Sequence, residues 1–231
     1  MKGLFFDSAN LEEFGKWFDT GILGGATTNP VILQKEGILN VPKHIDKMID
    51  ICGYDFPISI EVPDSEMAED EMIKLAHVYK ERFPYNAVIK IPMDCRDPQK
   101  AFRIISNLEF NHVETNATLG LTTGQFIGAM EAGATYASLF WGRCEEAVGC
   151  GAIDTLKTIL RYREVHNLHS KIIIGSIRSV KQIDQAFSLG ADIVTIPPKL
   201  LEEWMFTQRG VDTADEFNKA YRDVKDKMKL I

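Results

Sequence analysis

The segment 86-NAVIKIPMD-94 places a lysine in the middle of an apolar run. The residues around Lys90 show no alternation of apolar and polar side chains that would carry it to solvent. This pattern is typical of a parallel strand that is buried on both faces. Such a strand has no low-energy place for an ammonium group. Lys90 is therefore a surface lysine on a misread segment, a buried structural charge, or a reactive amine.

Seven further short apolar segments alternate with amphipathic helical patterns along the chain. We expect strands at 3–6, 24–27, 57–62, 86–91, 112–118, 135–140, 171–176 and 191–196. We expect helices at 10–18, 41–51, 65–82, 97–108, 122–132, 152–166, 180–189 and 199–206. Ser65 is expected to cap the third of these helices. Eight strand–helix pairs predict that residues 1–231 form a single (β/α)8 barrel, a TIM barrel.

A doubly wound open sheet is the structural alternative to the barrel. It is disfavoured because it rarely uses eight strands without a second domain, and because no G-x-G-x-x-G motif follows the first strand. Residues 211–231 predict one more helix, with Phe217, Tyr221 and Val224 along one face. This helix has no strand partner, so we expect it to cover a barrel end or a neighbouring subunit.

Composition disfavours several classes of protein. The net charge of −7 argues against a nucleic-acid-binding surface, and no apolar run approaches the length of a membrane span. The N-terminal region lacks a basic start followed by an apolar core, and the four cysteines form no C-x-x-C pair. We therefore expect a cytoplasmic protein with unpaired thiols. His166 and His169 have no third ligand nearby, so no metal site is expected.

Side chains suited to binding or catalysis gather at the carboxyl ends of the predicted strands, where barrel enzymes place their active sites. They are Asp7, Asn29 in 27-TTNP-30, Glu61, Lys90, Asn116, Thr118, Phe140, Arg143, Ser176 and Arg178. The eighth strand, which ends in 196-IPPK-199, contributes no obvious chemistry. Several members also have a structural interpretation, since Asp7 and Asn29 could begin helices and Ser176 could cap one. The set as a whole is more specific than its members.

The set has a clear chemical use. Burial disfavours the charged form of a lysine, and a free amine can attack a ketone to give a Schiff base. The Schiff base accepts electrons, so the adjacent C–C bond can break. Glu61 and Asp7 are carboxylates available for proton transfer, and Arg143 and Arg178 can hold a terminal oxyanion. On these grounds Lys90 is predicted to be a nucleophile.

Eight segments of the chain, in the right order, resemble the transaldolase family. They are 4-LFFDSAN-10, 26-ATTNPVIL-33, 58-ISIEV-62, 88-VIKIP-92, 115-TNATL-119, 133-GATYASLFWGR-143, 174-IGSIR-178 and 190-GADIVTIP-197. The similarity points to the small subfamily that includes fructose-6-phosphate aldolases. It implies a class I aldolase with no metal or other cofactor, in which Lys90 forms the Schiff base. It also implies a homo-oligomer, a pentamer or decamer, whose C-terminal helix reaches a neighbour.

By the same resemblance, Asp7 is the acid/base at the hydroxyl of the cleaved bond, while Glu61 and Thr118 hold a water that shuttles protons. The other positions are implied to bind substrate: Asn29, Asn116 and Ser138 at hydroxyls, and Arg143, Ser176 and Arg178 at a terminal phosphate. The implied substrates are a sugar phosphate or similar anionic ketose as donor and an aldehyde as acceptor.

Two positions distinguish branches of the family. Aldolases that release free dihydroxyacetone resemble this chain but carry Gln and Tyr where it has Glu61 and Phe140. We therefore expect transfer of a dihydroxyacetone unit between sugars. A fructose-6-phosphate aldolase that releases the unit, and a barrel that binds a sugar phosphate without turnover, are the alternatives.

The segment 138-SLFWGR-143 departs from the usual Ser-Pro-Phe-Val-Gly-Arg at Leu139 and Trp141. Trp141 is expected to bind substrate, because its indole N–H donates a hydrogen bond without adding charge beside Arg143. Such a site would suit a singly charged sulfonate, so a transaldolase specialised for 6-deoxy-6-sulfofructose is a further alternative. In the opposite interpretation, Trp141 packs behind the barrel and phosphate is preferred.

Overall fold

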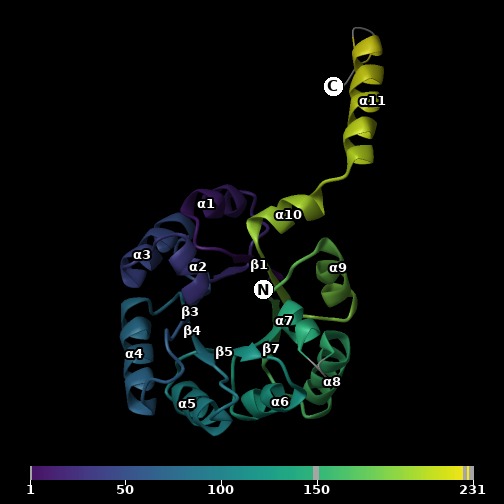
Figure 1. Cartoon of the computed structure of the whole chain (residues 1–231). Coiled ribbons are helices and arrows are strands. Elements are labelled where there is room, and N and C mark those ends of the chain that lie inside the picture. The colour runs from purple at the N-terminus through teal and green to yellow at the C-terminus, as the bar shows by residue number, and fades with distance from the viewer. Residues whose placement is uncertain (1, 148–150, 226–227, 229–231) are drawn as a thin grey trace.

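The computed structural model describes residues 2–147, 151–225 and 228, and its centre is a closed parallel barrel. Each strand pairs with the next, and the eighth pairs with the first. The strands are β1 (Leu4–Asp7), β2 (Gly25–Thr27), β3 (Ile58–Glu61), β4 (Ala87–Pro92), β5 (Thr115–Gly120), β6 (Tyr136–Phe140), β7 (Lys171–Gly175) and β8 (Ile193–Ile196). The helices surround them as an outer ring (Figure 1). The prediction of a (β/α)8 barrel is confirmed.

The helices lie between and after the strands. They are α1 (Leu11–Asp19), α2 (Pro30–Lys35), α3 (Val41–Cys52), α4 (Glu69–Arg82), α5 (Pro98–Phe110), α6 (Thr123–Glu131), α7 (Trp141–Glu146), α8 (Ala152–Val165), α9 (Val180–Ser188), α10 (Pro198–Met205) and α11 (Gln208–Val224). The helix expected from residue 65 begins at Glu69 instead, after Ala68 as its N-cap. Ser65 does not cap it, because its Oγ donates a hydrogen bond to Asp94 over 2.8 Å.

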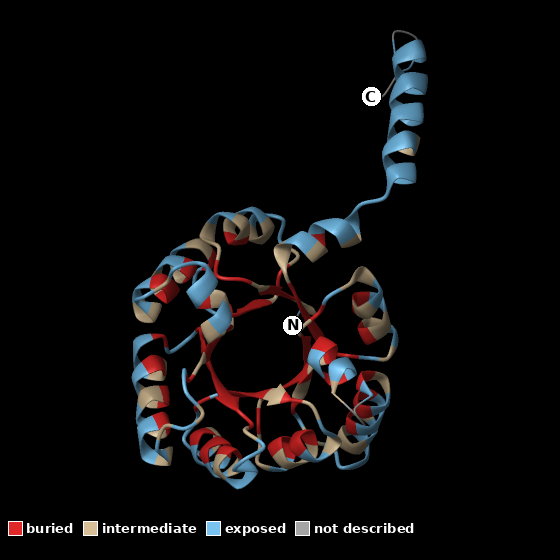
Figure 2. Ribbon diagram, viewed as in Figure 1, coloured by how far each residue is buried: buried red, intermediate tan, exposed pale blue. Residues whose placement is uncertain are grey.

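The core consists of the barrel strands and the inward faces of the helices around them, as Figure 2 shows. All six residues of β4 are buried, including Lys90. The register of the parallel strands places Glu61 of β3 beside Lys90, and Lys90 beside Asn116 of β5. Three polar side chains therefore occupy neighbouring positions within an apolar framework.

The helix α11 extends away from the barrel (Figure 1), and Figure 2 shows that its surface is almost entirely exposed. None of the residues of α11 from Gln208 to Val224 is buried. The helix begins three residues before the predicted start at Val211. The predicted end lies outside the described residues.

Two further sequence expectations concern cysteines and membranes. Cys52 and Cys95 are free, but Cys144 is disulfide-bonded, so the expectation of unpaired thiols is wrong at that position. The expectation failed because the absence of a C-x-x-C pair does not exclude a disulfide between cysteines at another spacing. Cys150 lies outside the described residues. Within the described part of the chain, no helix has both the length and the apolar character that crossing a bilayer requires.

Candidate active site

The amine of Lys90 is held inside the barrel. The side chain is 4% exposed, and Nζ donates a hydrogen bond to the main-chain oxygen of Thr28 over 2.8 Å. Nζ also lies 3.0 Å from Oε2 of Glu61, whose side chain is 8% exposed. Removing either partner of such a buried pair leaves a charge without compensation. Lys90 is thus not a surface lysine, and the carboxylate of Glu61 is buried beside it.

Asp7 lines the same cavity as Lys90. Its Oδ1 accepts a hydrogen bond of 2.7 Å from Oγ1 of Thr27, which lies 2.5 Å from Oγ1 of Thr195. Because Thr27 donates to Asp7, Thr195 is the donor to Thr27. Burial raises the pKa of Asp7, and the hydrogen bond from Thr27 offsets part of that rise. The carboxyl therefore keeps its proton to a higher pH than an ordinary aspartic acid.

Two asparagines take part in defined hydrogen bonds at the site. Ser138 donates to Oδ1 of Asn116 over 2.7 Å, and Nδ2 of Asn116 donates to Oγ of Ser59 over 3.1 Å. These two bonds fix the orientation of a fully buried amide. Asn29 accepts a hydrogen bond of 2.9 Å from the amide of Ile32, so it does cap α2, as its structural interpretation requires. Asn29 also lines the cavity.

The cavity has a volume of about 100 Å3 and lies at the carboxyl end of the barrel. It is lined by Asp7, Thr27, Asn29, Lys90, Ser138, Phe140, Arg143, Gly175, Ser176 and Thr195. An adjoining cleft of about 390 Å3 shares Asp7, Asn29 and Arg143 with it. Seven of the side chains predicted from the sequence therefore meet at one place: Asp7, Asn29, Lys90, Ser138, Phe140, Arg143 and Ser176.

Three buried side-chain atoms of the described residues have no hydrogen-bond partner: Oε2 of Glu61, Oγ1 of Thr118 and Nε2 of His44. The pair of Glu61 with Lys90 at 3.0 Å is an ion pair without the alignment of a hydrogen bond. Thr118 is the register partner of Pro92, two residues after Lys90. Buried polar atoms without partners are rare in folded proteins. Two of the three belong to Glu61 and Thr118, which the resemblance to the transaldolase family implies to hold a water.

Arg143 reaches the cavity from α7, and Ser176 reaches it from the residue that follows β7. The guanidinium of Arg143 lies over the ring of Phe140, 5.5 Å from its centroid, in a cation–π contact. Ser176 has a φ of +55°, and its carbonyl oxygen accepts a hydrogen bond of 3.1 Å from the amide of Gly142. The end of β7 and the start of α7 are thereby tied together beside the cavity.

Trp141 and Arg178 do not line the cavity. Trp141 is fully buried, and its Nε1 donates to Oε1 of Glu145 over 2.6 Å. Arg178 is about half exposed and forms two contacts with the carboxylate of Glu146, with Nη2 3.1 Å from Oε2. The structure therefore favours the interpretation in which Trp141 packs behind the cavity wall.

A family model described as Transaldolase/Fructose-6-phosphate aldolase matches residues 4–229. The chain belongs to this family. A probable transaldolase of Clostridioides difficile (strain 630) is 35% identical over 216 residues, which cover 90% of this chain and 93% of the relative. A probable transaldolase of Clostridium kluyveri is 36% identical over 229 residues, which cover 97% and 99%. The protein is an enzyme of the transaldolase type.

A solved structure supports the fold of this transaldolase-type enzyme. The crystal structure of a mandelate oxidase aligns with a TM-score of 0.55 over 82% of this chain and 59% of that chain. The two sequences are 12% identical, so the likeness shows the fold alone.

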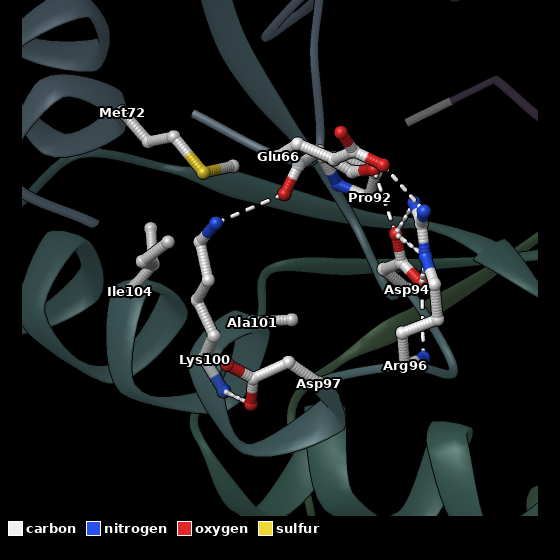
Figure 3. Close-up of a pocket in the computed structure, with 10 residues that line it drawn as sticks. Glu66, Met72, Pro92, Asp94, Arg96, Asp97, Lys100, Ala101 and Ile104 are labelled. Carbon is white, nitrogen blue, oxygen red and sulfur yellow. Dashed lines mark hydrogen bonds and ion pairs between the residues drawn. The ribbon is translucent and has the colours of Figure 1, made fainter. Parts of the chain in front are cut away.

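A second cavity of the transaldolase-type barrel, of about 300 Å3, lies between α4 and α5 (Figure 3). Its charged side chains are already paired: Arg96 binds Asp94 and Glu66, and Lys100 donates to the main-chain oxygen of Ser65 over 2.9 Å. The hydrogen bonds from Arg96 hold the pKa of Asp94 well below its usual range. These contacts connect the loops that follow β3 and β4, so the cavity supports the strands of the buried ion pair.

Three threonines that the sequence patterns do not single out contact the candidate catalytic groups of this transaldolase-type enzyme. Thr28 accepts the hydrogen bond from Lys90, and Thr27 and Thr195 form the chain of hydroxyls that ends on Asp7. The eighth strand, from which no obvious chemistry is expected, lines the cavity with Thr195. The available signal was the polar end of the second strand, 27-TTNP-30, where threonines interrupt an apolar pattern.

Proposed function

We propose that this enzyme transfers a dihydroxyacetone unit from a ketose with an anionic group at C6, such as fructose 6-phosphate, to an aldehyde acceptor through a Schiff base on Lys90. The observation that carries the proposal is the buried pair of Lys90 and Glu61 at 3.0 Å, with Asp7 on the same cavity. An amine beside a carboxylate can lose its proton and attack a ketone. A structural ion pair alone would need no third ionisable group.

Formation of the Schiff base uses Glu61 as the proton acceptor. Lys90 gives a proton to Glu61, and the neutral amine attacks the C2 carbonyl of the ketose. The carbinolamine then loses its hydroxyl as water, with a proton returned by Glu61. One water bound between Glu61 and Thr118 would give a hydrogen-bond partner to two buried oxygens that lack one, and it would carry these protons. The carbonyl of Thr28 orients the amine during attack.

Cleavage and transfer use Asp7. The carboxylate takes the proton of the C4 hydroxyl, and the C3–C4 bond breaks. The bonding electrons move into the Schiff base, giving an enamine, and an aldehyde leaves. The enamine then attacks the carbonyl carbon of the acceptor, and Asp7 returns the proton to the new alkoxide. Hydrolysis frees Lys90. The raised pKa of Asp7 makes its carboxylate a stronger base than an ordinary aspartate, which suits a group that first takes a proton and then returns it.

The other residues bind substrate in this proposal. Asn29, Asn116 and Ser138 contact hydroxyls of the donor, while Arg143, Ser176 and Arg178 contact its terminal anion. Phe140 offers no hydroxyl beside the Schiff base, which favours group transfer over release of free dihydroxyacetone. A transaldolase specialised for 6-deoxy-6-sulfofructose is the second candidate, because Glu146 already pairs with Arg178 and a singly charged group needs less compensation.

We also propose that the enzyme is a homo-oligomer, a pentamer or decamer, in which α11 packs on a neighbouring subunit. Phe217, Tyr221 and Val224 are 71%, 45% and 40% exposed along this helix. An exposed apolar stripe of this kind marks an interaction surface.

Borohydride reduction in the presence of fructose 6-phosphate tests the proposed function. The enzyme should gain a stable adduct on the peptide that contains 88-VIKIP-92, because reduction converts the Schiff base to a secondary amine. Lys90→Met should lose both adduct and transfer, with circular dichroism used to establish that the variant is folded. Lys80→Met, on α4, is the matched control and should retain both. An adduct mapped to another lysine would contradict the assignment.

A further inference from the structure

The carboxylate of Glu146 forms an ion pair with the guanidinium of Arg178. Arg178 is one of the two arginines proposed to bind the terminal anion. Nη1 of Arg178 donates to Oε1 of Glu146, and Nη2 donates to Oε2 over 3.1 Å. The side chains are 49% and 59% exposed, so solvent reaches the pair. In such a bidentate contact, two N–H groups of the guanidinium donate to the two carboxylate oxygens. These N–H groups are then not free to bind the terminal anion of a substrate.

The side chain of Arg178 packs directly against the main chain of α7 at Gly142. A Cβ on Gly142 would lie 2.7 Å from Nε and 3.0 Å from Cδ of Arg178, so the arginine lies directly against the glycine. The main-chain amide of Arg178 also donates to Oε1 of Gln182 over 2.7 Å. The direction of the arginine toward Glu146 thus follows from close packing as well as from charge.

A hydrogen-bonded chain holds the acidic turn of α7 in place. Nε2 of Gln182 donates to one oxygen of Glu145 over 2.8 Å, and the indole of Trp141 donates to the other over 2.6 Å. Trp141 is fully buried, so it anchors this turn to the core. Glu146 is the next residue, and the anchored turn presents it to Arg178. Trp141 therefore acts on the anion site through α7, as a positioning residue.

We propose that Glu146 is a specificity determinant that stays paired with Arg178 in the substrate complex and shifts the preference of the site away from a doubly charged terminal group and toward a singly charged one. The inference rests on the proposed function, because it concerns the terminal group of the same donor. The two arginines supply two positive charges, and Glu146 removes one. A phosphate monoester carries about −1.5 to −2 charges at pH 7, so Glu146 repels it more than a sulfonate or another monoanion.

The test compares three donors in the wild type and in Glu146→Gln: fructose 6-phosphate, 6-deoxy-6-sulfofructose and uncharged fructose. The substitution should raise kcat/KM for the phosphate roughly two- to fivefold more than for the sulfonate, a modest factor because the pair is half exposed. The change should lie in KM, with fructose unaffected. Glu146→Asp should keep the wild-type ratio. Glu164→Gln, which removes a carboxylate from the exposed Arg161 pair on α8, is the matched control.

Binding of methyl phosphate and methanesulfonate, followed by NMR titration, tests the same inference without turnover. Glu146→Gln should tighten methyl phosphate more than methanesulfonate by a similar factor. An equal gain in affinity for the two anions would show that Glu146 moves away from Arg178 when an anion binds. No gain in affinity for either anion would show that Glu146 lies outside the site. Either result overturns the inference. If no ketose is turned over but the two anions respond as expected, the proposed function fails and the inference about the charge stands.

Discussion

At the scale of single residues, the hydroxyl of Thr27 controls how readily Asp7 ionises. It donates a 2.7 Å hydrogen bond to the carboxylate and so opposes the effect of burial, which raises the pKa of Asp7. Thr27→Val removes the donor at nearly constant volume. We expect the acidic limb of the kcat profile to move to higher pH by roughly one to two units, since a hydrogen bond to a charged group contributes about 1.5–3 kcal/mol.

Thr27→Ser is the control for this change, because it keeps the hydroxyl and should keep the wild-type pH profile. A profile that is unchanged in Thr27→Val would show that another group controls the acidic limb.

Asp7→Asn should separate adduct formation from bond cleavage. Transfer should fall by roughly 10²–10⁴-fold, the range typical of a general acid/base, while borohydride still traps the Schiff base on Lys90. Single-turnover kinetics with trapping at each time point would measure both steps. Equal loss of trapping and transfer would contradict the division of roles between Asp7 and Glu61.

The same substitution should stabilise the fold at neutral pH. Because folding raises the pKa of Asp7, the folded state favours its protonated form, and the stability contributed by Asp7 is lost as pH rises through that raised pKa. Asn carries no such charge. We expect Asp7→Asn to increase the free energy of unfolding at pH 7, where the buried carboxylate of the wild type is least favourable. Urea denaturation should show the gain shrinking as pH falls toward 4.

The residue types of the site are predictable from the sequence, but their partners are not. Lys90 stands out because an apolar strand surrounds it, and Asp7 and Glu61 end strands of the same kind. Thr28 is 62 positions from Lys90 in the sequence, and Glu146 is 32 from Arg178. Contacts at such separations depend on the closure of the barrel. Sequence spacing alone does not give them.

At the scale of elements, the eight strands are predictable because each is a short apolar run between turn residues. The helices α2 and α7 are missed, since six residues do not complete two turns of helical periodicity. The missed helix α7 is the one that carries Trp141. If residue 141 belonged to a strand, its side chain would point to one of the two faces in alternation with its neighbours. In the helix, the indole N–H of Trp141 instead donates to Glu145, four residues later.

The contact between α7 and β7 leads to a prediction at Gly142. A Cβ there would lie 2.6 Å from the carbonyl oxygen of Ser176, a main-chain atom that cannot easily move. Gly142→Ala should therefore lower the free energy of unfolding by roughly 1–3 kcal/mol, as overpacking does, and weaken binding of anionic donors more than of fructose. Thermal unfolding and KM for the two donor types would measure these effects.

Gly15→Ala on α1 is the matched control, because nothing lies within 4 Å of the added Cβ. Alanine at this helical position should stabilise the protein by about 0.5–1 kcal/mol. If Gly142→Ala behaved like Gly15→Ala, the end of β7 would be less constrained than the packing indicates.

At the scale of the whole molecule, α11 stands apart from the barrel and has no buried residue among Gln208–Val224. Truncation after Phe206 should leave the barrel folded but dissociate the oligomer, because the helix contributes its apolar stripe to a neighbour and little to its own core. Analytical ultracentrifugation of the full chain and the truncated chain would measure the change. Phe217→Ser should weaken association, whereas Lys219→Ser, on the same helix, should not. A full-length chain that sediments as a monomer would contradict the proposed assembly.

The hydroxyl chain from Thr195 through Thr27 to Asp7 joins the last strand of the barrel to the first two. During synthesis, β1 leaves the ribosome long before β8, so a nascent chain holds the proposed acid/base residue without its full environment. Asp7 obtains that environment only when β8 pairs with β1. A chain interrupted before residue 193 would have the lysine and both carboxylates yet lack this support. In the proposed mechanism, proton transfer by Asp7 would then be the step that is acquired last, when β8 closes the barrel.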